Sequence, residues 1–341
     1  EIAALRRLVY CGEWIQSHVL HAAMLHAPDF LGLPDAVHIA RDRPDLVRTA
    51  LRLKKLGNAI METVGGRAVH PVNTRIGGFY RSPEREAVAA LLPELEWAVR
   101  ASRDLALAFA TFDYPPFEAD YLFVSLIHPD TYPITEGRIG TSDGLDIPVE
   151  DFRAHFSETQ MARSTALHGR TRTGAPYLVG PLARYANNAA RLSESCKETA
   201  AAVGLGAVER NPFRSILVRM VETQYACEEA LRLACAYAPP DPAHVAAAPR
   251  AGTGCGATEA PRGLCWHRYG IDAGGRIETA LIVPPTAQNQ PQIEADLAAV
   301  AGAALDLDDD ALRHRCEQAI RNHDPCISCA THFLDLTVER V

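Results

Sequence analysis

Apolar residues recur every three or four positions along most of the chain, which is the spacing of amphipathic helices. This pattern predicts a first helix over residues 2–25, ended by Pro28, a second over residues 44–64 and a third over residues 82–112. Longer helices are also predicted over residues 180–203 and 211–237, and shorter ones over residues 290–304 and 308–321.

Residues at the expected helix ends support these boundaries. Asp42 is a candidate N-cap for the second helix, and Gly65 and Gly66 follow its last apolar position as a stop signal. Ser82 precedes a proline at the start of the third helix, while Pro93 removes a backbone donor and predicts a kink.

The pattern changes after residue 237. Residues 238–258 are rich in Pro, Ala and Gly and predict a loop. Two apolar runs, residues 264–271 and 276–283, flank the sequence Asp-Ala-Gly-Gly, which favours a tight turn and predicts a hairpin. We therefore expect a mainly α fold, with a multi-helix core and a small β-hairpin region near the C-terminus, in one domain over residues 1–341.

Composition narrows the class of protein. The chain is 48% hydrophobic and 22% charged, which is typical of a globular fold, and its net charge of -8 argues against binding to nucleic acid. Its longest apolar stretches are shorter than the roughly eighteen residues of a membrane span. Nine scattered cysteines favour a reducing compartment, so a cytoplasmic location is expected.

The most specific local motif lies close to the C-terminus. Cys326, Cys329 and His332 follow one another at three-residue intervals after a predicted helix. Two thiolates at this spacing can bind one thiophilic metal, such as zinc, nickel or iron. A thiol redox pair and a structural zinc site are the alternatives, and the residues alone leave zinc open.

A second motif, Glu-Ala-Pro-Arg-Gly, precedes the predicted hairpin. Pro261 fixes the backbone before Arg262, and Gly263 allows the backbone after it to pass close to another group. The permanent positive charge of Arg262 is therefore presented from a defined loop. The alternative is a surface ion pair between Arg262 and Glu259.

Two further features have both functional and structural interpretations. The paired glycines of residues 65–66 and 77–78 predict a tightly packed turn close to the site, or simply a helix cap and a bend. His18 and His21 lie one helical turn apart and could support a metal centre, although neutral histidines that hydrogen-bond within a core are commoner.

Taken in order, these motifs resemble those of the large subunit of nickel-iron hydrogenases. The resemblance rests on the glycine pair before His70 and Pro71, the Glu-Ala-Pro-Arg-Gly loop, the Val-Pro-Pro-Thr run that ends at Thr286, and the terminal Asp-Pro-Cys-x-x-Cys-x-x-His. The residues within and around these motifs are similar to those of the cytoplasmic, cofactor-coupled group of the family, which includes NAD(P)-linked enzymes and sulfhydrogenases.

The resemblance implies a nickel ion held by four thiolates and an iron ion with carbon monoxide and cyanide ligands. Cys326 would bind nickel, Cys329 would bridge the two metals, and His332 would bind a magnesium-like ion. Arg262 would lie over the metals and be oriented by Asp324. The backbone at Pro261 and Thr286 would line the cyanide pocket.

The resemblance also implies partner proteins: an iron-sulfur small subunit, flavin- and NAD(P)-binding subunits, and a maturation endopeptidase that removes residues 333–341. The family's other Cys-x-x-Cys is expected upstream of residue 1, so the polypeptide as given is expected to be inactive alone. The alternatives are a zinc-binding scaffold and a degenerate relative of the quinone-module subunit of respiratory complex I.

Overall fold

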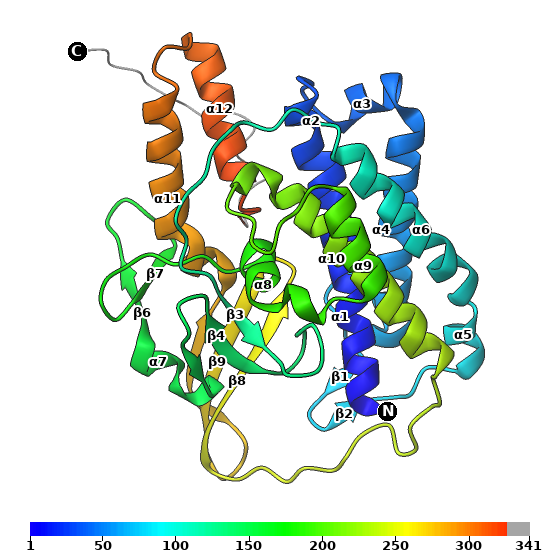
Figure 1. Cartoon of the computed structure of the whole chain (residues 1–341). Helices are drawn as coiled ribbons and strands as arrows, with labels where there is room; N and C mark the ends of the chain where they lie inside the picture. The colour runs from blue at the N-terminus through cyan, green and yellow to red at the C-terminus, as the bar shows by residue number, and fades with distance from the viewer. Residues whose placement is uncertain (326–341) are drawn as a thin grey trace.

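The computed structural model describes residues 1–325 as a helical body beside a smaller layer of short sheets (Figure 1). The body contains α1 (Ile2–Val19), the π-helix η1 (Leu20–His26), α2 (Ala27–Phe30), α3 (Ala36–Asp42), α4 (Pro44–Gly65), α5 (Arg85–Ala89), α6 (Leu92–Phe109), α9 (Glu194–Ala202) and α10 (Ser215–Cys235). The short α8 (Pro181–Asn188) lies between this body and the sheets, and α11 (Pro285–Ala303) and α12 (Asp309–Arg321) form a pair above the sheets.

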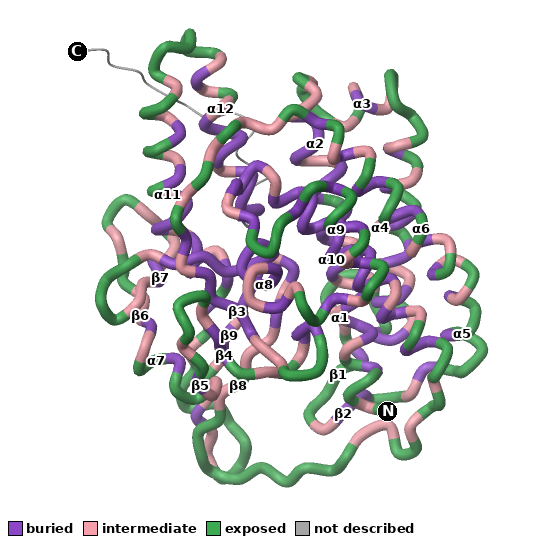
Figure 2. Tube along the Cα trace, viewed as in Figure 1, coloured by how far each residue is buried: buried purple, intermediate pink, exposed green. Residues whose placement is uncertain are grey.

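α10 is the central helix of the body, packed against α1 and α6. Residues 215–227 are all buried, so this helix has no solvent face over more than three turns. Figure 2 shows the same burial as a continuous purple core through α1, α4 and α10. Because the helix is enclosed, its charged residues Arg219 and Glu222 must find partners inside the protein.

Glycines allow α1 and α4 to cross with their backbones in contact. A Cβ atom on Gly57 would lie 2.6 Å from the carbonyl oxygen of Gly12, and one on Gly12 would lie 2.9 Å from the carbonyl oxygen of Gly57. No side chain can occupy these positions without separating the two helices.

The sheet layer contains two three-stranded antiparallel sheets and a two-stranded one. Their orders are β3-β4-β5, β10-β9-β8 and β6-β7, and a further pair, β1-β2, lies near the start of α1. A second apolar cluster, which includes Phe152, Tyr177 and Trp266, fills the space between the sheets. The strands are β1 (Thr74–Arg75), β2 (Gly78–Phe79), β3 (Val124–Ile127), β4 (Arg138–Thr141), β5 (Asp146–Ile147), β6 (Phe156–Gln160), β7 (Leu167–Thr171), β8 (Gly252–Ala260), β9 (Gly263–Ile271) and β10 (Ile277–Val283).

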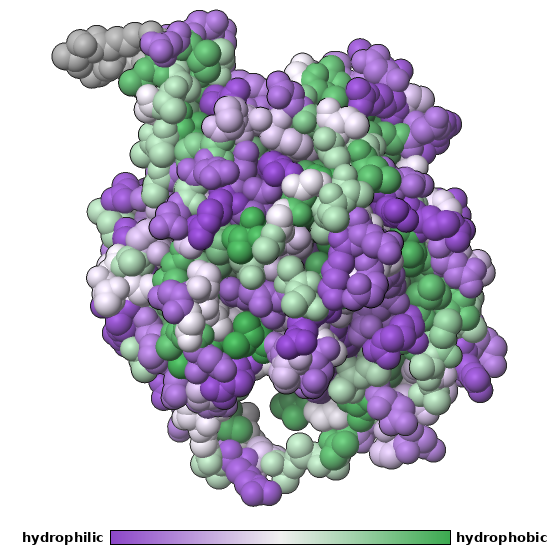
Figure 3. Space-filling model, in the orientation of Figure 1, coloured by the Kyte–Doolittle hydropathy of each residue, from purple (hydrophilic) through white to green (hydrophobic). Residues whose placement is uncertain are grey.

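The expected mainly α fold is found, but the β content is greater than predicted. The two segments assigned to a hairpin are the antiparallel strands β9 and β10, and β8 pairs with the other side of β9. The prediction of a loop through residue 258 was therefore wrong from Gly252 onward, because alternate glycines masked the strand pattern. Residues 238–251 remain a mostly exposed strap along the lower edge of the molecule, separated from the body by an opening visible in Figure 3.

Three predicted helix boundaries were wrong. Pro28 does not end the first helical segment, because it lies in the first turn of α2, where its missing N–H is tolerated. Asp42 belongs to α3, and Arg43 is the residue that precedes α4. Instead of a kink at Pro93 in one helix from Ser82, there are two helices, and Pro93 lies in the first turn of α6.

Other predicted boundaries agree more closely. Gly66 ends α4 with φ 78°, a left-handed conformation that favours glycine. Asp308 caps α12 by accepting from the backbone N–H of Ala311 at 2.8 Å. The segment over residues 180–203 is interrupted, however, because the 3-10 turn η3 (Ala189–Arg191) separates α8 from α9.

The predicted turn at residues 77–78 packs against the strap. A Cβ atom on Gly77 would lie 2.0 Å from the carbonyl oxygen of Val245, and one on Gly78 would lie 2.4 Å from the carbonyl oxygen of Ala243. The paired glycines therefore form a helix cap at Gly66 and a tightly packed turn at Gly77 and Gly78. Within residues 1–325, no helix is long and apolar enough to cross a bilayer.

The α1–α4 crossing makes a stability prediction. Gly57→Ala is expected to lower the free energy of unfolding by about 1–3 kcal/mol, because the added methyl group overpacks the crossing. Gly302→Ala in α11 is the matched control, since nothing lies within 4 Å of its Cβ position. It should raise the free energy of unfolding by about 0.5–1 kcal/mol through helix propensity. Urea denaturation of the two variants measures both changes in the free energy of unfolding. Equal changes would contradict the close contact of the α1 and α4 backbones.

Candidate functional site

The backbone at residues 321–324, just before the terminal cysteine motif, is anchored by two distant elements. His21 Nε2 lies 2.8 Å from the carbonyl oxygen of Arg321. Ser215 Oγ and Arg219 Nη2 donate to the carbonyl oxygen of Asn322 at 2.9 and 3.1 Å. η1 and α10 therefore both hold the exit of α12.

Two buried carboxylates hold the side chains of the same segment. Asp29 accepts two bonds from Arg321, Nε–Oδ2 at 2.6 Å and Nη2–Oδ1 at 2.7 Å. Asp296 of α11 lies 2.9 Å from His323 Nε2 and also accepts from Tyr121 Oη at 2.7 Å. Because a buried carboxylate without partners is costly, these pairs favour one position of the segment.

Asp324 and Arg262, the two residues assigned a catalytic role from the sequence, are brought together. Arg262 Nε donates to the carbonyl oxygen of Asp324 at 2.8 Å, and Nη2 lies 3.2 Å from Oδ1. Asp324 is buried, with φ 47°, whereas the Arg262 side chain remains 34% exposed. Burial raises the pKa of Asp324, while the charges of Arg262 and Arg219 oppose that rise.

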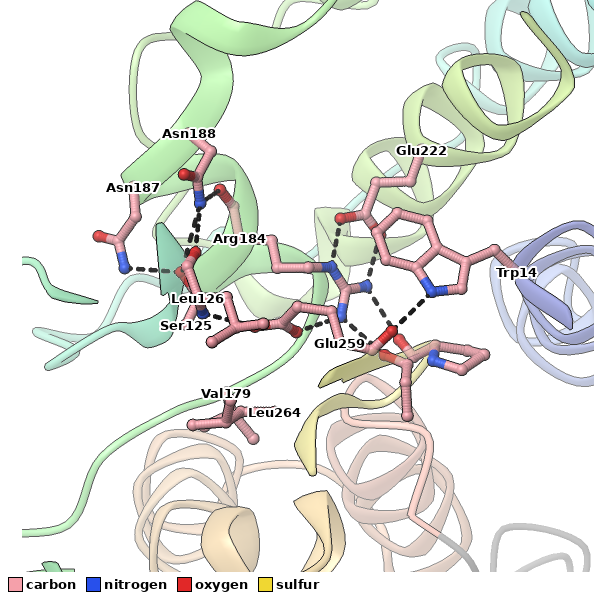
Figure 4. A network of polar contacts seen from close by, with 12 residues as sticks. Trp14, Ser125, Leu126, Val179, Arg184, Asn187, Asn188, Glu222, Glu259 and Leu264 are labelled. Carbon is pink, nitrogen blue, oxygen red and sulfur yellow. Dashed lines mark hydrogen bonds and ion pairs between the residues drawn. The ribbon is translucent and has the colours of Figure 1, made fainter. Parts of the chain in front are cut away.

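Arg184 of α8 holds the loop that presents Arg262. Its guanidinium donates to both oxygens of Glu222 at 2.7 Å and to Glu259 Oε2 at 3.0 Å. It also donates to the carbonyl oxygens of Ala260 and Pro261, each at 2.9 Å. Figure 4 shows this guanidinium between the two carboxylates. One buried arginine therefore binds the three residues that precede Arg262.

α1 and β3 complete the enclosure of this loop. Trp14 Nε1 donates to the carbonyl oxygen of Glu259 at 2.9 Å, and its ring centre lies 4.4 Å from the Arg184 guanidinium carbon. The backbone N–H of Leu126 donates to Glu259 Oε1 at 2.7 Å. The loop is thus held from both sides by groups that are themselves buried.

The two carboxylates beside Arg184 differ in their titration. Burial opposes ionisation of both, but the two bonds from Arg184 prevail at Glu222 and lower its pKa to about 2. At Glu259 burial prevails over Arg184 and raises the pKa to about 7. Glu222 is therefore the principal counter-charge of Arg184 at neutral pH. The proposed surface pair of Glu259 with Arg262 was wrong, because Glu259 is fully buried and bonded to Arg184.

The remaining predicted residues fall in several places. Pro261 is buried at the turn between β8 and β9, and Thr286 is half-buried in the first turn of α11. Gln288 donates to the carbonyl oxygen of Leu264 at 2.5 Å, which holds that turn beside the strand following Arg262. The predicted metal ligands lie outside the described residues: Cys326, Cys329 and His332.

His18 and His21, in the first helical segment, are both buried and contact groups inside the protein core. His18 Nε2 lies 3.0 Å from Glu222 Oε2, and His21 bonds the backbone of Arg321. In residues 1–325, no three His, Cys, Asp or Glu side chains are grouped so that they could hold a metal ion. For the implied metals, the thiols of Cys326 and Cys329 are donors of the right softness.

Sequence reasoning missed the buried charges that position the site: Asp29, Arg184, Arg219, Glu222 and Asp296. A usable signal was present for some of them, since Arg219 and Glu222 interrupt an apolar run that starts at Ile216. A charged residue inside a fully buried helix indicates an internal partner. The identity of that partner depends on tertiary contacts.

The buried histidines predict acid sensitivity. Burial lowers the pKa of His18 to about 4 from its ordinary value of 6.5, although the nearby Glu222 opposes the shift. At this site the unfolded chain therefore binds a proton between about pH 6.5 and 4 that the folded chain does not, so His18 alone should lower the free energy of unfolding by about 3 kcal/mol over that window. Urea denaturation at several pH values measures this loss.

His18→Gln should remove the His18 share of this pH dependence, because the replacement does not titrate, while His21 and His26, whose pKa values burial also lowers, keep theirs. The exposed His38→Gln is the control and should retain the full slope. A His18→Gln profile as steep as that of the unaltered protein would contradict the assignment.

The chain is similar in sequence to known proteins. The profile of the family described as "Nickel-dependent hydrogenase" matches residues 167–332. The sequence is 32% identical to sulfhydrogenase 1 subunit alpha of Pyrococcus furiosus, over 98% of this chain and 79% of that protein. It is 26% identical to NAD-reducing hydrogenase HoxS subunit beta of Cupriavidus necator, over 97% of this chain and 76% of that one.

The fold is also similar to solved structures. The structure of an NAD+-reducing [NiFe]-hydrogenase in the H2-reduced state superposes with a TM-score of 0.80. It covers 97% of this chain and 80% of that one, at 21% identity, and therefore supports the fold. Taken with the sequence relationship along nearly the whole chain, these findings mean that the protein belongs to the nickel-dependent hydrogenase family, as a large subunit.

Proposed function

We propose that the chain is the catalytic subunit of an enzyme that interconverts H2 with protons and electrons, passing the electrons to an iron-sulfur small subunit and then to NAD(P). The observation that carries the proposal is the Arg262–Asp324 pair, held beside the start of the terminal thiol motif. Membership of a hydrogenase family supports the same reaction.

In this proposal, Cys326 and Cys329 bind the metals and His332 binds a magnesium-like ion. The bound group would be a nickel ion joined to an iron ion that carries carbon monoxide and cyanide, and it would supply the site at which H2 is polarised. Pro261 and Thr286 would form part of the pocket for cyanide. The two cysteines are soft ligands that suit nickel and iron.

Arg262 is suited to act on a group beside these cysteines. Asp324 engages its Nε and Nη2 atoms, while Nη1 makes no hydrogen bond to any residue in the range 1–325. A guanidinium remains charged at all physiological pH values, so this nitrogen offers a fixed donor towards negative charge. The carboxylate and carbonyl of Asp324 orient the donor.

The partners follow from the same proposal. We expect an iron-sulfur small subunit, flavin- and NAD(P)-binding subunits in a cytoplasmic complex, and an endopeptidase that removes residues 333–341 during maturation. The NAD-reducing and sulfhydrogenase relatives support a multisubunit assembly of this type.

Infrared spectroscopy tests the metal centre. The complex purified anaerobically from its native host should show absorption bands from both carbon monoxide and cyanide bound to iron. Intact, metal-replete protein without these bands would favour a zinc-binding or degenerate scaffold subunit instead.

Arg262→Lys tests the role of the guanidinium. Lysine keeps the charge but lacks the planar fork, so the rate of H2 oxidation should fall by about 100-fold or more while the infrared bands remain. Arg138→Lys, in an exposed pair with Asp146, is the control and should leave the rate unchanged. Similar rates for the two variants would exclude a catalytic role for Arg262.

A further inference from the structure

The backbones at the start of α8 and just after Arg262 are in direct contact through two glycines. A Cβ atom on Gly180 would lie 2.7 Å from the carbonyl oxygen of Arg262, and one on Gly263 would lie 2.6 Å from the backbone nitrogen of Gly180. Both glycines have positive φ, 109° and 133°, which other residues rarely adopt. Because no side chain fits between the two segments, this glycine contact fixes one side of the Arg262 backbone.

Two consecutive amide side chains of α11 hold the chain on both sides of the glycine contact. Asn289 Oδ1 accepts from the backbone N–H of Val179 at 2.8 Å, and Asn289 Nδ2 donates to the carbonyl oxygen of the same residue at 3.1 Å. Gln288 Nε2 donates to the carbonyl oxygens of Leu264 at 2.5 Å and of Val283 at 3.2 Å. α11 is thus bonded to the residue before one glycine and to the residue after the other.

The two amides are buried and fully bonded. Gln288 and Asn289 are 0% and 3% exposed, and Gln288 Oε1 also accepts from Tyr177 Oη at 3.3 Å. Every polar atom of both amides therefore has a partner within residues 1–325, and such a network favours a single arrangement. The amides follow Thr286 by two and three residues, so they join the Arg262 loop to the first turn of α11.

We propose that Gly180, Gln288 and Asn289 are positioning residues for Arg262 in the hydrogenase reaction. They fix the chain after Arg262, while Arg184 binds the carbonyl oxygens of the two residues before it. They act through the backbone, because their contacts at this loop are made to main-chain atoms. A displacement of about 1 Å at a catalytic group can lower a rate about 100-fold. The inference rests on the proposed catalytic role of Arg262.

A purely structural role would require less than this arrangement. Val179 and Leu264 already belong to one apolar cluster, which joins the two segments without any polar bond. The amides add directional bonds to main-chain atoms on both sides of the glycine contact. Directional bonds define a position more narrowly than apolar contact does, which is what a catalytic group requires.

Gly180→Ala tests the glycine contact, with Gly174→Ala as the matched control. Both glycines have positive φ, but nothing lies within 4 Å of the Cβ position of Gly174, so only Gly180→Ala presses on the Arg262 backbone. In the native complex, kcat for H2 oxidation per loaded metal centre should fall about 10- to 100-fold in Gly180→Ala. The KM for H2 should change less than twofold, and the infrared bands of carbon monoxide and cyanide should shift but remain. Gly174→Ala should match the unaltered complex in all three measurements.

Gln288→Leu tests the amides, with Gln224→Leu as the matched control. Gln224 is also a buried amide that donates two bonds, to Ser195 Oγ at 3.2 Å and to Glu228 Oε1 at 3.0 Å, but these connect α10 to α9 and within α10. Gln288→Leu should lower kcat per loaded centre and shift the infrared bands as Gly180→Ala does. Gln224→Leu should leave both unchanged.

Rates per loaded centre and band positions equal to those of the controls would overturn the positioning role. So would failure of Gly180→Ala and Gln288→Leu to assemble a loaded complex when both controls do, because the contacts would then be structural only. An unaltered complex without the infrared bands and without H2 oxidation would instead refute the proposed function. The two failures are therefore distinguishable.

Discussion

The structure depends on one buried arginine. Arg184 connects α8 to Glu222 of α10 and to the Glu259 loop, while the Trp14 ring of α1 covers its guanidinium. Burying one cation and two carboxylates is unfavourable unless every group is paired, and here every donor of the guanidinium has an acceptor. Removing either the arginine or its carboxylate partners would leave an unpaired charge buried, which would lower the free energy of unfolding by about 3–5 kcal/mol. The cluster therefore stabilises one arrangement of helices and loop.

A second set of buried polar contacts acts on the other half of the site. Asp29, Ser215, Arg219 and Asp296 hold residues 321–324, and the two sets meet where Arg262 bonds Asp324. Because the two sets share α10, which carries both Arg219 and Glu222, movement of that helix would displace both members of the pair. Arg219 and Glu222 therefore have a structural role inside an otherwise largely apolar buried helix.

The solved structures indicate that this fold persists through large sequence change. At 21% identity the fold still superposes with a TM-score of 0.80. A family resemblance expected from short motifs is thereby confirmed by similarity over almost the whole chain.

The sequence by itself determined the local features of this protein. Helical periodicity located α4, α10 and α12 because their apolar faces and end residues are encoded within each segment. The spacing of Arg262 and the terminal cysteines indicated the family for the same reason. Local patterns failed at β8, where glycines hide the strand, and at Pro28, which lies in the first turn of α2, where its missing N–H is tolerated.

Only the tertiary structure decided which charges are buried and with which partners. Nothing local to Glu259 indicates Arg184, 75 residues away, and nothing local to Asp29 indicates Arg321, 292 residues away. These pairings exist because helices and loops that are distant in sequence exclude water from the same small volume. In that volume an unpaired charge is costly, so the partner is determined by packing in three dimensions.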